Sequence, residues 1–274
     1  MSALPEGLVL DPVQRLTRDL AAASRTLSAG EARFLVDAYY TMQDQRIRSS
    51  NQIRSLVKSE EPHDVLAWFM AQAEGLEDQV KRALGAYAAA PLVGKWSLSQ
   101  YGIGPVIAAG LLAHIDITKA PTVGHIWRFA GLDPTVTWKE GQKRPWNARL
   151  KVLCWKLGES FKRFSGKEAC VYGTVYLARK RQEVLRNDSG AFADQAALTL
   201  AARPKHKQRA IYADGRLPNG RLDLRATRYA VKLFLAHWHH VASEVEYGTP
   251  PPKPYVIEHL GHAHFVAPPG WPIE

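Results

Sequence analysis

The sequence predicts a mainly α-helical protein, in which an N-terminal antiparallel helical hairpin, similar to a coiled coil, precedes a helical domain. Apolar residues recur at three- and four-residue steps over two long stretches, and shorter amphipathic segments follow a break near residue 91. A length of 274 residues suffices for one large domain or two modest ones. We place the boundaries at 1–90, 91–248 and 249–274, the last being a proline-rich extended tail.

Local signals place the helices of the first region. Asp11-Pro12 offers a capping side chain followed by proline at the first helical position. Ser28 and Glu31 have the spacing of a capping box. Helices are therefore expected over about residues 12–25, 29–58 and 63–90. The two long helices should bury their apolar stripes against each other, and a homo-oligomer formed through them is the alternative.

The second region should contain shorter helices. After a helical hairpin near residues 97–115, a helical segment is expected over 146–186 and an amphipathic helix over 225–247. Residues 187–223 contain several glycine and proline turn sequences. We therefore expect a long surface excursion there, with at most one short helix around 192–202.

Positive charge is concentrated in one part of the chain. The whole protein carries a formal charge of +10, whereas residues 139–232 alone hold 22 Lys and Arg against 8 Asp and Glu. A positive field confined to one region attracts polyanions and releases counterions from phosphates. The charge pattern favours nucleic acid as a partner over a merely solvated basic surface.

The sequence offers no sign of secretion or of a membrane span. Its first residues lack a basic and then apolar leader pattern, and no window approaches the roughly 18 apolar residues of a span. The two cysteines, Cys154 and Cys170, are too few for a disulfide framework, and Cys154 lies in an apolar run. We therefore expect a cytoplasmic protein with reduced thiols and no membrane association.

The turn Gly102-Ile103-Gly104 is the most specific binding signal. Both glycines allow a positive φ and a close approach of the backbone to a phosphate. A new helix begins at Gly104-Pro105 with its unpaired N–H groups directed outward. Ile103 should anchor the turn in the core, and Ala108 is small enough for close helix packing. Together these features predict a helix-hairpin-helix that grips the phosphate backbone without reading bases.

The basic segment that follows adds candidates for phosphate contacts and base stacking. Trp138 and Trp146 interleave with lysines and arginines, a mixture that suits nucleic-acid binding. Trp155 lies in an apolar run and is expected in the core. The predicted nucleic-acid-binding residues are Gly102, Ile103, Gly104, Lys139, Lys143, Arg144, Trp146, Arg149 and Lys151. We expect no metal and no cofactor.

Three motifs in a fixed order carry a family resemblance. They are the Gly102–Pro105 turn, the sequence Ala-Gly-Leu-Asp-Pro over residues 130–134, and the basic helix that starts at Asn147. Over about Leu92 to Arg163 the chain resembles the C-terminal domain of the IS-one-ten/one-sixteen family of insertion-sequence transposases. Residues 225–232 resemble the same family more weakly. The resemblance implies DNA as the ligand and DNA transposition or recombination as the process, with a coiled coil upstream.

Two departures from that family argue against catalysis. Its members carry an N-terminal nuclease-like domain with four metal-binding carboxylates, for which we expect no room here. A serine thought to attack DNA follows their Ala-Gly-Leu-x-Pro step, whereas this chain has Thr135 and Thr137. Thr137 is the catalytic candidate if the chain is an enzyme, because cations follow it at Lys139 and Arg144. The sequence therefore favours a transposase-like, non-catalytic DNA-binding protein.

Other hypotheses stay open. The chain could be an active recombinase component that works with a partner or a guide RNA, or a structural scaffold, and structured RNA is an alternative ligand. A DNA glycosylase is disfavoured because Val123 stands where those enzymes carry a catalytic aspartate. His237 and His240 share a helix face and could ligate zinc with the histidines of residues 259–264, but the spacing matches no recognised ligand pattern.

Overall fold

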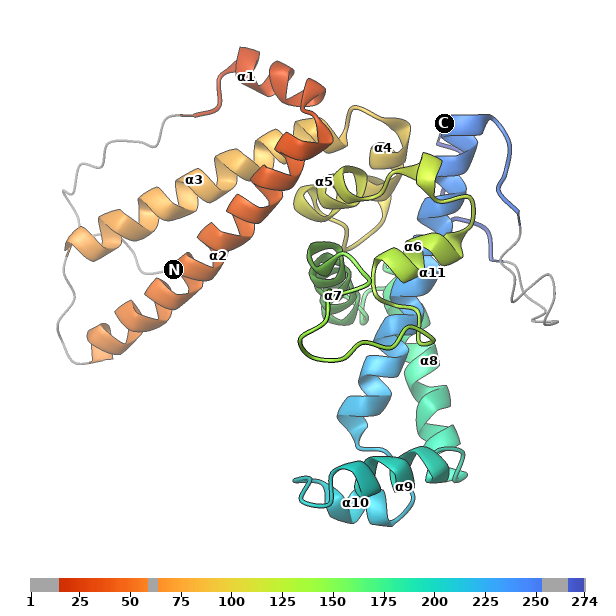
Figure 1. The fold of residues 1–274 in the computed structure, drawn as a ribbon. Coiled ribbons are helices and arrows are strands. Elements are labelled where there is room, and N and C mark those ends of the chain that lie inside the picture. The colour runs from red at the N-terminus through yellow and green to blue at the C-terminus, as the bar shows by residue number, and fades with distance from the viewer. Residues whose placement is uncertain (1–14, 59–63, 253–265, 274) are drawn as a thin grey trace. The chain divides into compact units, whose positions relative to one another are not determined.

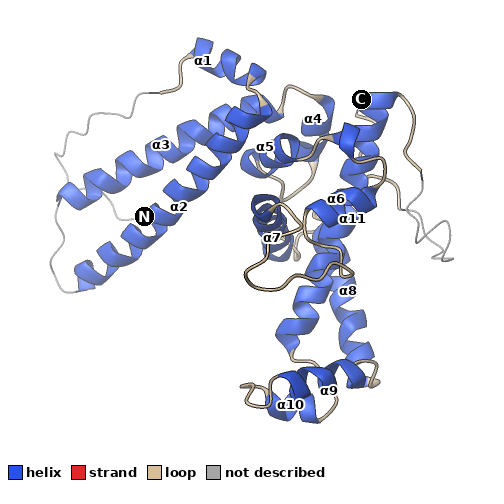
Figure 2. Cartoon of the chain, viewed as in Figure 1, coloured by secondary structure: helices blue, strands red, loops and turns tan. Residues whose placement is uncertain are grey.

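The computed structural model describes residues 15–58, 64–252 and 266–273, and every regular element in these ranges is a helix (Figures 1 and 2). The expected mainly α class is confirmed. The chain folds into two compact units. One comprises the described residues up to Leu98 together with Gly104–Asp116, and the other comprises Ser99–Ile103 and the described residues from Ile117 onward. Within the described part of the chain, no helix has both the length and the apolar character that crossing a membrane requires.

Local capping signals start the helices of the first unit. Its helices are α1 (Arg18–Ala23), α2 (Ala29–Lys58), α3 (Asp64–Ala88), α4 (Leu92–Ser99) and α5 (Pro105–His114). The capping box is confirmed, because the Ser28 N–H donates to Glu31 Oε2 at 2.7 Å and the Glu31 N–H donates to Ser28 Oγ at 3.3 Å. Helix α1 begins where Thr17 caps the Leu20 N–H. The expected start at Asp11-Pro12 lies outside the described residues.

Helices α2, α3 and α5 pack together around the core of the first unit. Leu84 and Ala108 are fully buried there. The Arg46 guanidinium donates to the Glu77 carboxylate at 2.6 Å, which ties α2 to α3. The burial of Ala108 agrees with the small-residue packing that the sequence predicts.

The second unit is built on α7, α8 and α11. Its helices are α6 (Val123–Phe129), α7 (Ala148–Arg163), α8 (Val171–Asp188), α9 (Ala193–Ala202), α10 (Arg209–Ala213) and α11 (Asn219–Tyr247). The helical segment expected over 146–186 is interrupted after Arg163, and Gly166 lies in the interruption. Gly158 lets α7 approach α11 closely, since a Cβ there would lie 2.5 Å from Thr227 Cγ2.

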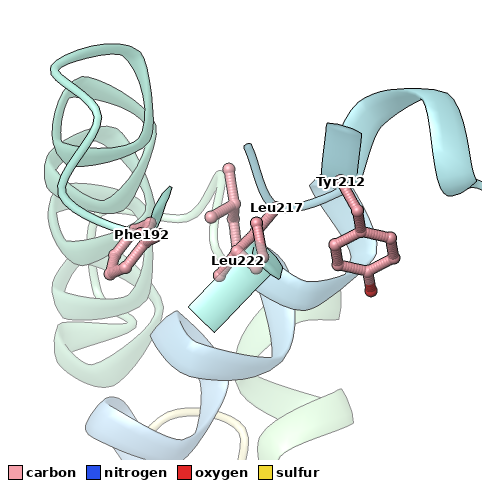
Figure 3. Packing of buried hydrophobic residues seen from close by; sticks show 5 residues of the cluster. Phe192, Tyr212, Leu217 and Leu222 are labelled. Atoms are coloured by element: carbon pink, nitrogen blue, oxygen red, sulfur yellow. The ribbon is translucent and has the colours of Figure 1, made fainter. Parts of the chain in front are cut away.

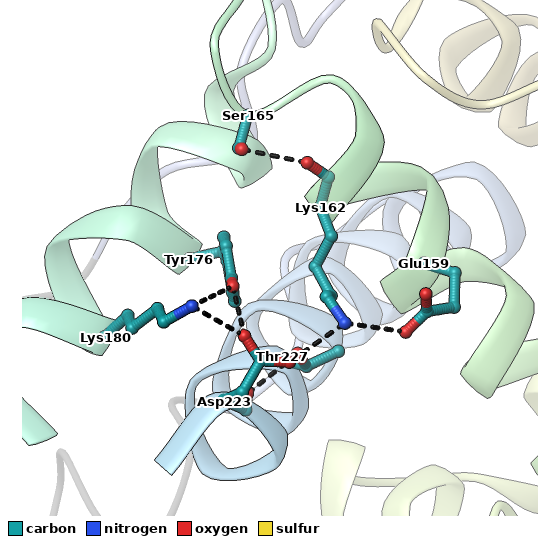
Figure 4. A network of polar contacts seen from close by, with 7 residues as sticks. All are labelled: Glu159, Lys162, Ser165, Tyr176, Lys180, Asp223 and Thr227. Carbon is teal, nitrogen blue, oxygen red and sulfur yellow. Dashed lines mark hydrogen bonds and ion pairs between the residues drawn. The ribbon is translucent and has the colours of Figure 1, made fainter. Parts of the chain in front are cut away.

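A charged node ties the three helices together (Figure 4). The Asp223 carboxylate of α11 lies 2.9 Å from both the Lys162 and the Lys180 ammonium groups and also accepts the Tyr176 hydroxyl. Partial burial alone would raise the pKa of Asp223, but the hydrogen bonds from Tyr176, Lys162 and Lys180 lower it to about 2. The Asp223 side chain therefore stays ionised and pairs with both lysines at the junction of α7, α8 and α11.

The prediction of a long surface excursion over residues 187–223 is wrong. This stretch forms α9, α10 and the start of α11, which enclose a small core of their own (Figure 3). The buried side chains of that core are Phe192, Ala196, Tyr212, Leu217 and Leu222. The Asn187 amide closes it by donating to the Leu217 carbonyl at 3.1 Å and accepting the Leu217 N–H at 2.8 Å. These apolar residues are spaced too irregularly in sequence to produce a helical period.

Candidate nucleic-acid interface

The turn between α4 and α5 has the backbone of a tight reversal. Gly102 has a φ of 93°, and the Ile103 N–H donates to the Gln100 carbonyl at 3.0 Å. Ile103 is buried, as the sequence predicts. Both glycines allow a positive φ, but only Gly102 adopts one; Gly104 has φ −92° and ψ 171° and starts α5 as an extended N-cap residue.

One edge of this turn is held by neighbouring helices. Ser160 Oγ donates to the Gly102 carbonyl at 2.5 Å, and the Cys170 thiol donates to the Tyr101 carbonyl at 3.5 Å. A Cβ on Gly102 would lie 3.4 Å from Ser160 Oγ, whereas a Cβ on Gly104 would meet nothing within 4 Å. Gly104 is therefore the glycine with room for an approaching ligand.

The loop before α7 is positioned by backbone contacts. Asn147 caps α7 by accepting the Leu150 N–H at 3.0 Å, and its own N–H donates to the Phe129 carbonyl at 2.9 Å. Gly131 has a φ of 65°, and a Cβ there would lie 2.9 Å from Trp146 and 3.0 Å from Lys151. The glycine of the Ala-Gly-Leu-x-Pro step thus makes the space in which Trp146 and Lys151 sit.

Trp138 and Trp146, both candidates for nucleic-acid binding, are in contact in this loop, and a cationic side chain lies over each ring. The Trp138 and Trp146 ring centroids are 6.1 Å apart at an interplanar angle of 63°. The Arg144 guanidinium lies 5.5 Å from the Trp138 centroid, and the Lys151 ammonium lies 4.0 Å from that of Trp146. Cation–π contacts therefore orient Arg144 and Lys151, and the described residues supply neither of them with a counter-ion.

These two cations share their surroundings with Arg228 of α11, and we call the three residues the cation cluster. Partial burial lowers the pKa of Lys151, and the charges of Arg228 and Arg144 lower it further. Burial likewise lowers the pKa of Arg228, together with the charges of Arg221 and Arg225. Among the described residues, no carboxylate lies within ion-pair distance of any member of the cluster. Such a group of repelling cations favours an anionic ligand.

Other cations of the basic region serve the fold. The Glu183 carboxylate is fully buried and receives Arg179 at 2.6 Å, Arg225 at 2.7 Å and Arg186 at 3.6 Å. Burial would raise the pKa of Glu183, but the hydrogen bond from Arg225 and the charge of Arg179 outweigh it, so the pKa is lowered. The net charge of residues 139–232 therefore overstates the charge that is available to a ligand.

The predicted site residues are only partly brought together. Lys139 and Lys143 are exposed in the loop, and Arg149 is exposed on α7. Arg149 precedes Lys151 by two positions, which is about 200° around a helix, so the two side chains leave α7 on different sides. The sequence interpretation missed Arg228, although Arg221, Arg225, Arg228 and Lys232 recur at three- and four-residue steps that place them on one face of α11.

The expectation that Trp155 is buried in the core is wrong, because 56% of its surface is exposed. Leu153, Cys154 and Leu157 take the inward positions of α7. Each residue turns the helix by about 100°, so a run of four apolar residues cannot all face the core. Val152, at 53% exposed, and Trp155 are the members of the run that face outward.

The proposed catalytic and metal candidates do not converge on a site. Thr137 is exposed, and no described carboxylate or imidazole is within hydrogen-bond distance of its hydroxyl, while Asp133 bonds Thr135 at 2.7 Å. His237 and His239 are buried and bonded to backbone carbonyls. No three His, Cys, Asp or Glu side chains are arranged to hold a metal ion within the described ranges. The histidines of residues 259–264 lie outside those ranges.

Comparisons of this chain with protein-family models, curated proteins and solved structures found no match. The site geometry and the sequence motifs are therefore the basis on which a function is proposed.

Proposed function

We propose that this protein is a transposase-like DNA-binding protein that grips the phosphate backbone and does not cut or join strands. The observation that carries the proposal is the cation cluster of Arg144, Lys151 and Arg228. Lys151 and Arg228 are partly desolvated, the charges of Arg228 and Arg144 both act on Lys151, and none of the three has a carboxylate partner among the described residues. A DNA strand presents one negative charge about every 3.4 Å, so phosphates would relieve that repulsion.

The turn at Gly102–Gly104 supplies a second element of the proposal. We assign α4, this turn and α5 to a helix-hairpin-helix, with Gly104 at the open start of α5. Gly102 lies against Ser160, nine positions along α7 from Lys151. That separation is about 14 Å along the helix axis, or about four base-pair steps of B-DNA. A contact at Gly102 and a contact at Lys151, both of which lie in the second unit, are therefore compatible with one stretch of backbone.

A non-catalytic role is favoured over an active recombinase. A threonine hydroxyl needs an activating base before it can attack phosphorus. The described residues place no such base beside Thr137. An active component that acquires its missing groups from a partner or a guide RNA is the alternative within the same class.

Salt-dependent binding tests the proposal directly. The affinity of the full-length protein for a short random-sequence duplex would be measured by fluorescence anisotropy over a series of salt concentrations. The triple variant Arg144→Gln, Lys151→Gln, Arg228→Gln should lower the slope of log affinity against log salt by about three units, because each phosphate contact contributes roughly 0.9. Circular dichroism would confirm that the variant keeps its helices.

A matched control removes the same charge from elsewhere. Arg33, Lys81 and Arg82 are exposed on α2 and α3, so changing all three to glutamine should leave the slope unchanged. Equal losses in both triple variants would show that net charge alone drives binding. An unchanged slope in the cluster variant would show that these three residues contact solvent, and would remove the basis of the proposal.

Self-association is a second candidate function that one observation favours. Val65, Trp68, Phe69 and Leu76 of α3 are all exposed. Their spacing places them on one side of the helix, and apolar stripes of this kind often mark protein contacts. Light scattering after size exclusion tests this scaffold hypothesis, since Trp68→Glu with Phe69→Glu should convert an oligomer to a monomer. A monomeric wild type would reject it.

A further inference from the structure

We propose that Trp155 stacks on an unpaired base, so that the preferred ligand contains single-stranded DNA. The inference rests on the proposed DNA-binding function and names the class of DNA that the same site takes. It starts from an exposed tryptophan on α7.

Trp155 is the most exposed of the described tryptophans. The inward positions beside it are filled by Leu150, Leu153 and Leu157, all of which are buried. An exposed position in a helix interior is served as well by any good helix former. An exposed indole at this position is therefore better explained by a contact with a ligand than by the stability of α7.

The position of Trp155 follows from the contacts of its helix. Residues 151, 155, 158 and 162 recur at steps of four, three and four residues, so they form one stripe along α7. Gly158 faces Thr227 of α11, and Lys162 pairs with Asp223 of α11. The stripe therefore runs along the edge of α7 next to α11, and Trp155 lies on that edge.

Cations flank this edge. Lys151 is one helical turn before Trp155, and the Arg228 charge on α11 is close enough to lower the pKa of Lys151. Glu159 is one turn after Trp155, but its carboxylate is held by Lys162 at 3.1 Å. An aromatic ring beside uncompensated cations is the arrangement that binds single strands, in which bases stack on the ring while phosphates meet the cations.

The chemistry favours a single strand over a closed duplex and over a protein. In a closed duplex the base faces are covered by their neighbours, so an indole has no free face to stack on. A protein partner would need acidic groups to match the cluster, whereas every nucleotide brings both a phosphate and an aromatic face. DNA is the source to which the inference commits, because the proposed function is DNA binding.

The test compares Trp155→Leu with Trp155→Phe in the full-length protein. The probes are a short oligothymidine, a random-sequence duplex and an oligouridine of the same length as the oligothymidine. Trp155→Leu should weaken binding to oligothymidine about ten-fold, since one stacked base has an effect of roughly this size. It should change duplex binding less than about two-fold. Trp155→Phe should keep most of the affinity because a phenyl ring still stacks.

Phe34→Leu is the matched control. Phe34 is an exposed aromatic residue of α2, and its loss should change none of the three affinities. Both Trp155 variants alter an exposed side chain, so circular dichroism and the thermal midpoint should match the wild type.

Three results would overturn the inference while leaving the DNA-binding proposal standing. One is an equal loss on oligothymidine and duplex, and another is no loss on either. The third is tighter, Trp155-dependent binding of oligouridine, which would replace DNA with RNA as the ligand of this residue. The DNA-binding proposal itself fails by a different result, namely an unchanged salt slope in the cation-cluster variant.

Discussion

Acid should selectively weaken the second unit through one buried histidine. His237 is 3% exposed in α11. Its Nδ1 lies 2.8 Å from the Tyr172 hydroxyl and its Nε2 lies 2.9 Å from the Val266 carbonyl. A neutral ring protonated at Nε2 satisfies both contacts, because Nδ1 then accepts from Tyr172 and Nε2 donates to Val266. A second proton on the ring would remove the acceptor at Nδ1.

The size of the effect follows from the pKa. Burial lowers the pKa of His237 from 6.5 to about 4, although the hydrogen bond to the Val266 carbonyl opposes that change. Because the folded pKa is depressed, the unfolded chain binds the proton first as the pH falls. The stability that the neutral His237 ring contributes is therefore intact above about pH 6.5 and is lost on acidification to pH 4. At about 1.36 kcal/mol per unit, the loss is roughly 2 kcal/mol by pH 5 and roughly 3 kcal/mol in full.

Hydrogen exchange of peptides from α8 and α11 measures this stability within the second unit, after correction for intrinsic exchange rates. The free energy of opening should fall by about 2 kcal/mol between pH 7 and pH 5 in the wild type. His237→Gln should remove most of that fall. The remaining loss of stability should come from His239, whose pKa is also lowered by burial.

His125→Gln is the control, because this exposed histidine lies in α6 and its loss should keep the full acid effect. A wild type with equal protection at pH 7 and pH 5 would refute the reasoning. So would a His237→Gln protein that loses as much stability as the wild type.

Three further predictions concern the turn, the helix packing and the chemistry. Gly104→Val should weaken duplex binding in anisotropy assays without lowering the thermal midpoint, and unchanged affinity would remove the turn from the interface. Gly158→Ala should destabilise the second unit by about 1–3 kcal/mol in urea melts because α7 must move away from α11, whereas Gly124→Ala on an exposed face should not. The protein with magnesium or manganese should neither nick nor join DNA on gels, and a covalent adduct that disappears in Thr137→Ala would restore the recombinase hypothesis.

The long helices of the first unit were predictable because their signals are local. The Ser28 and Glu31 pair marks the start of α2, and the helix ends at Lys58 as expected. Capping depends on side chains within one turn of each other, so the sequence contains the whole interaction. The burial of Ile103 and Ala108 was predictable for a similar reason, since both lie in short apolar patterns.

The errors arise where distant residues decide the structure. The core around Phe192 and Tyr212 forms only when α9, α10 and the start of α11 come together, and no periodic pattern announces it. Trp155 was assigned to the core because its neighbours are apolar, but the direction of a helical side chain depends on its phase relative to Leu153 and Leu157.

The sequence alone could not show which basic residues pair with carboxylates inside the fold and which are left without such a partner. Asp223 and Glu183 hold cations inside the second unit, and these two carboxylates explain why a basic region can fold compactly. Arg144, Lys151 and Arg228 remain near one another without such a partner among the described residues, and their mutual repulsion works against the folded state. A ligand that binds the folded state through phosphates would remove that repulsion and stabilise the fold. If the proposed function is correct, the same three residues would link the stability of this unit to the presence of a polyanion.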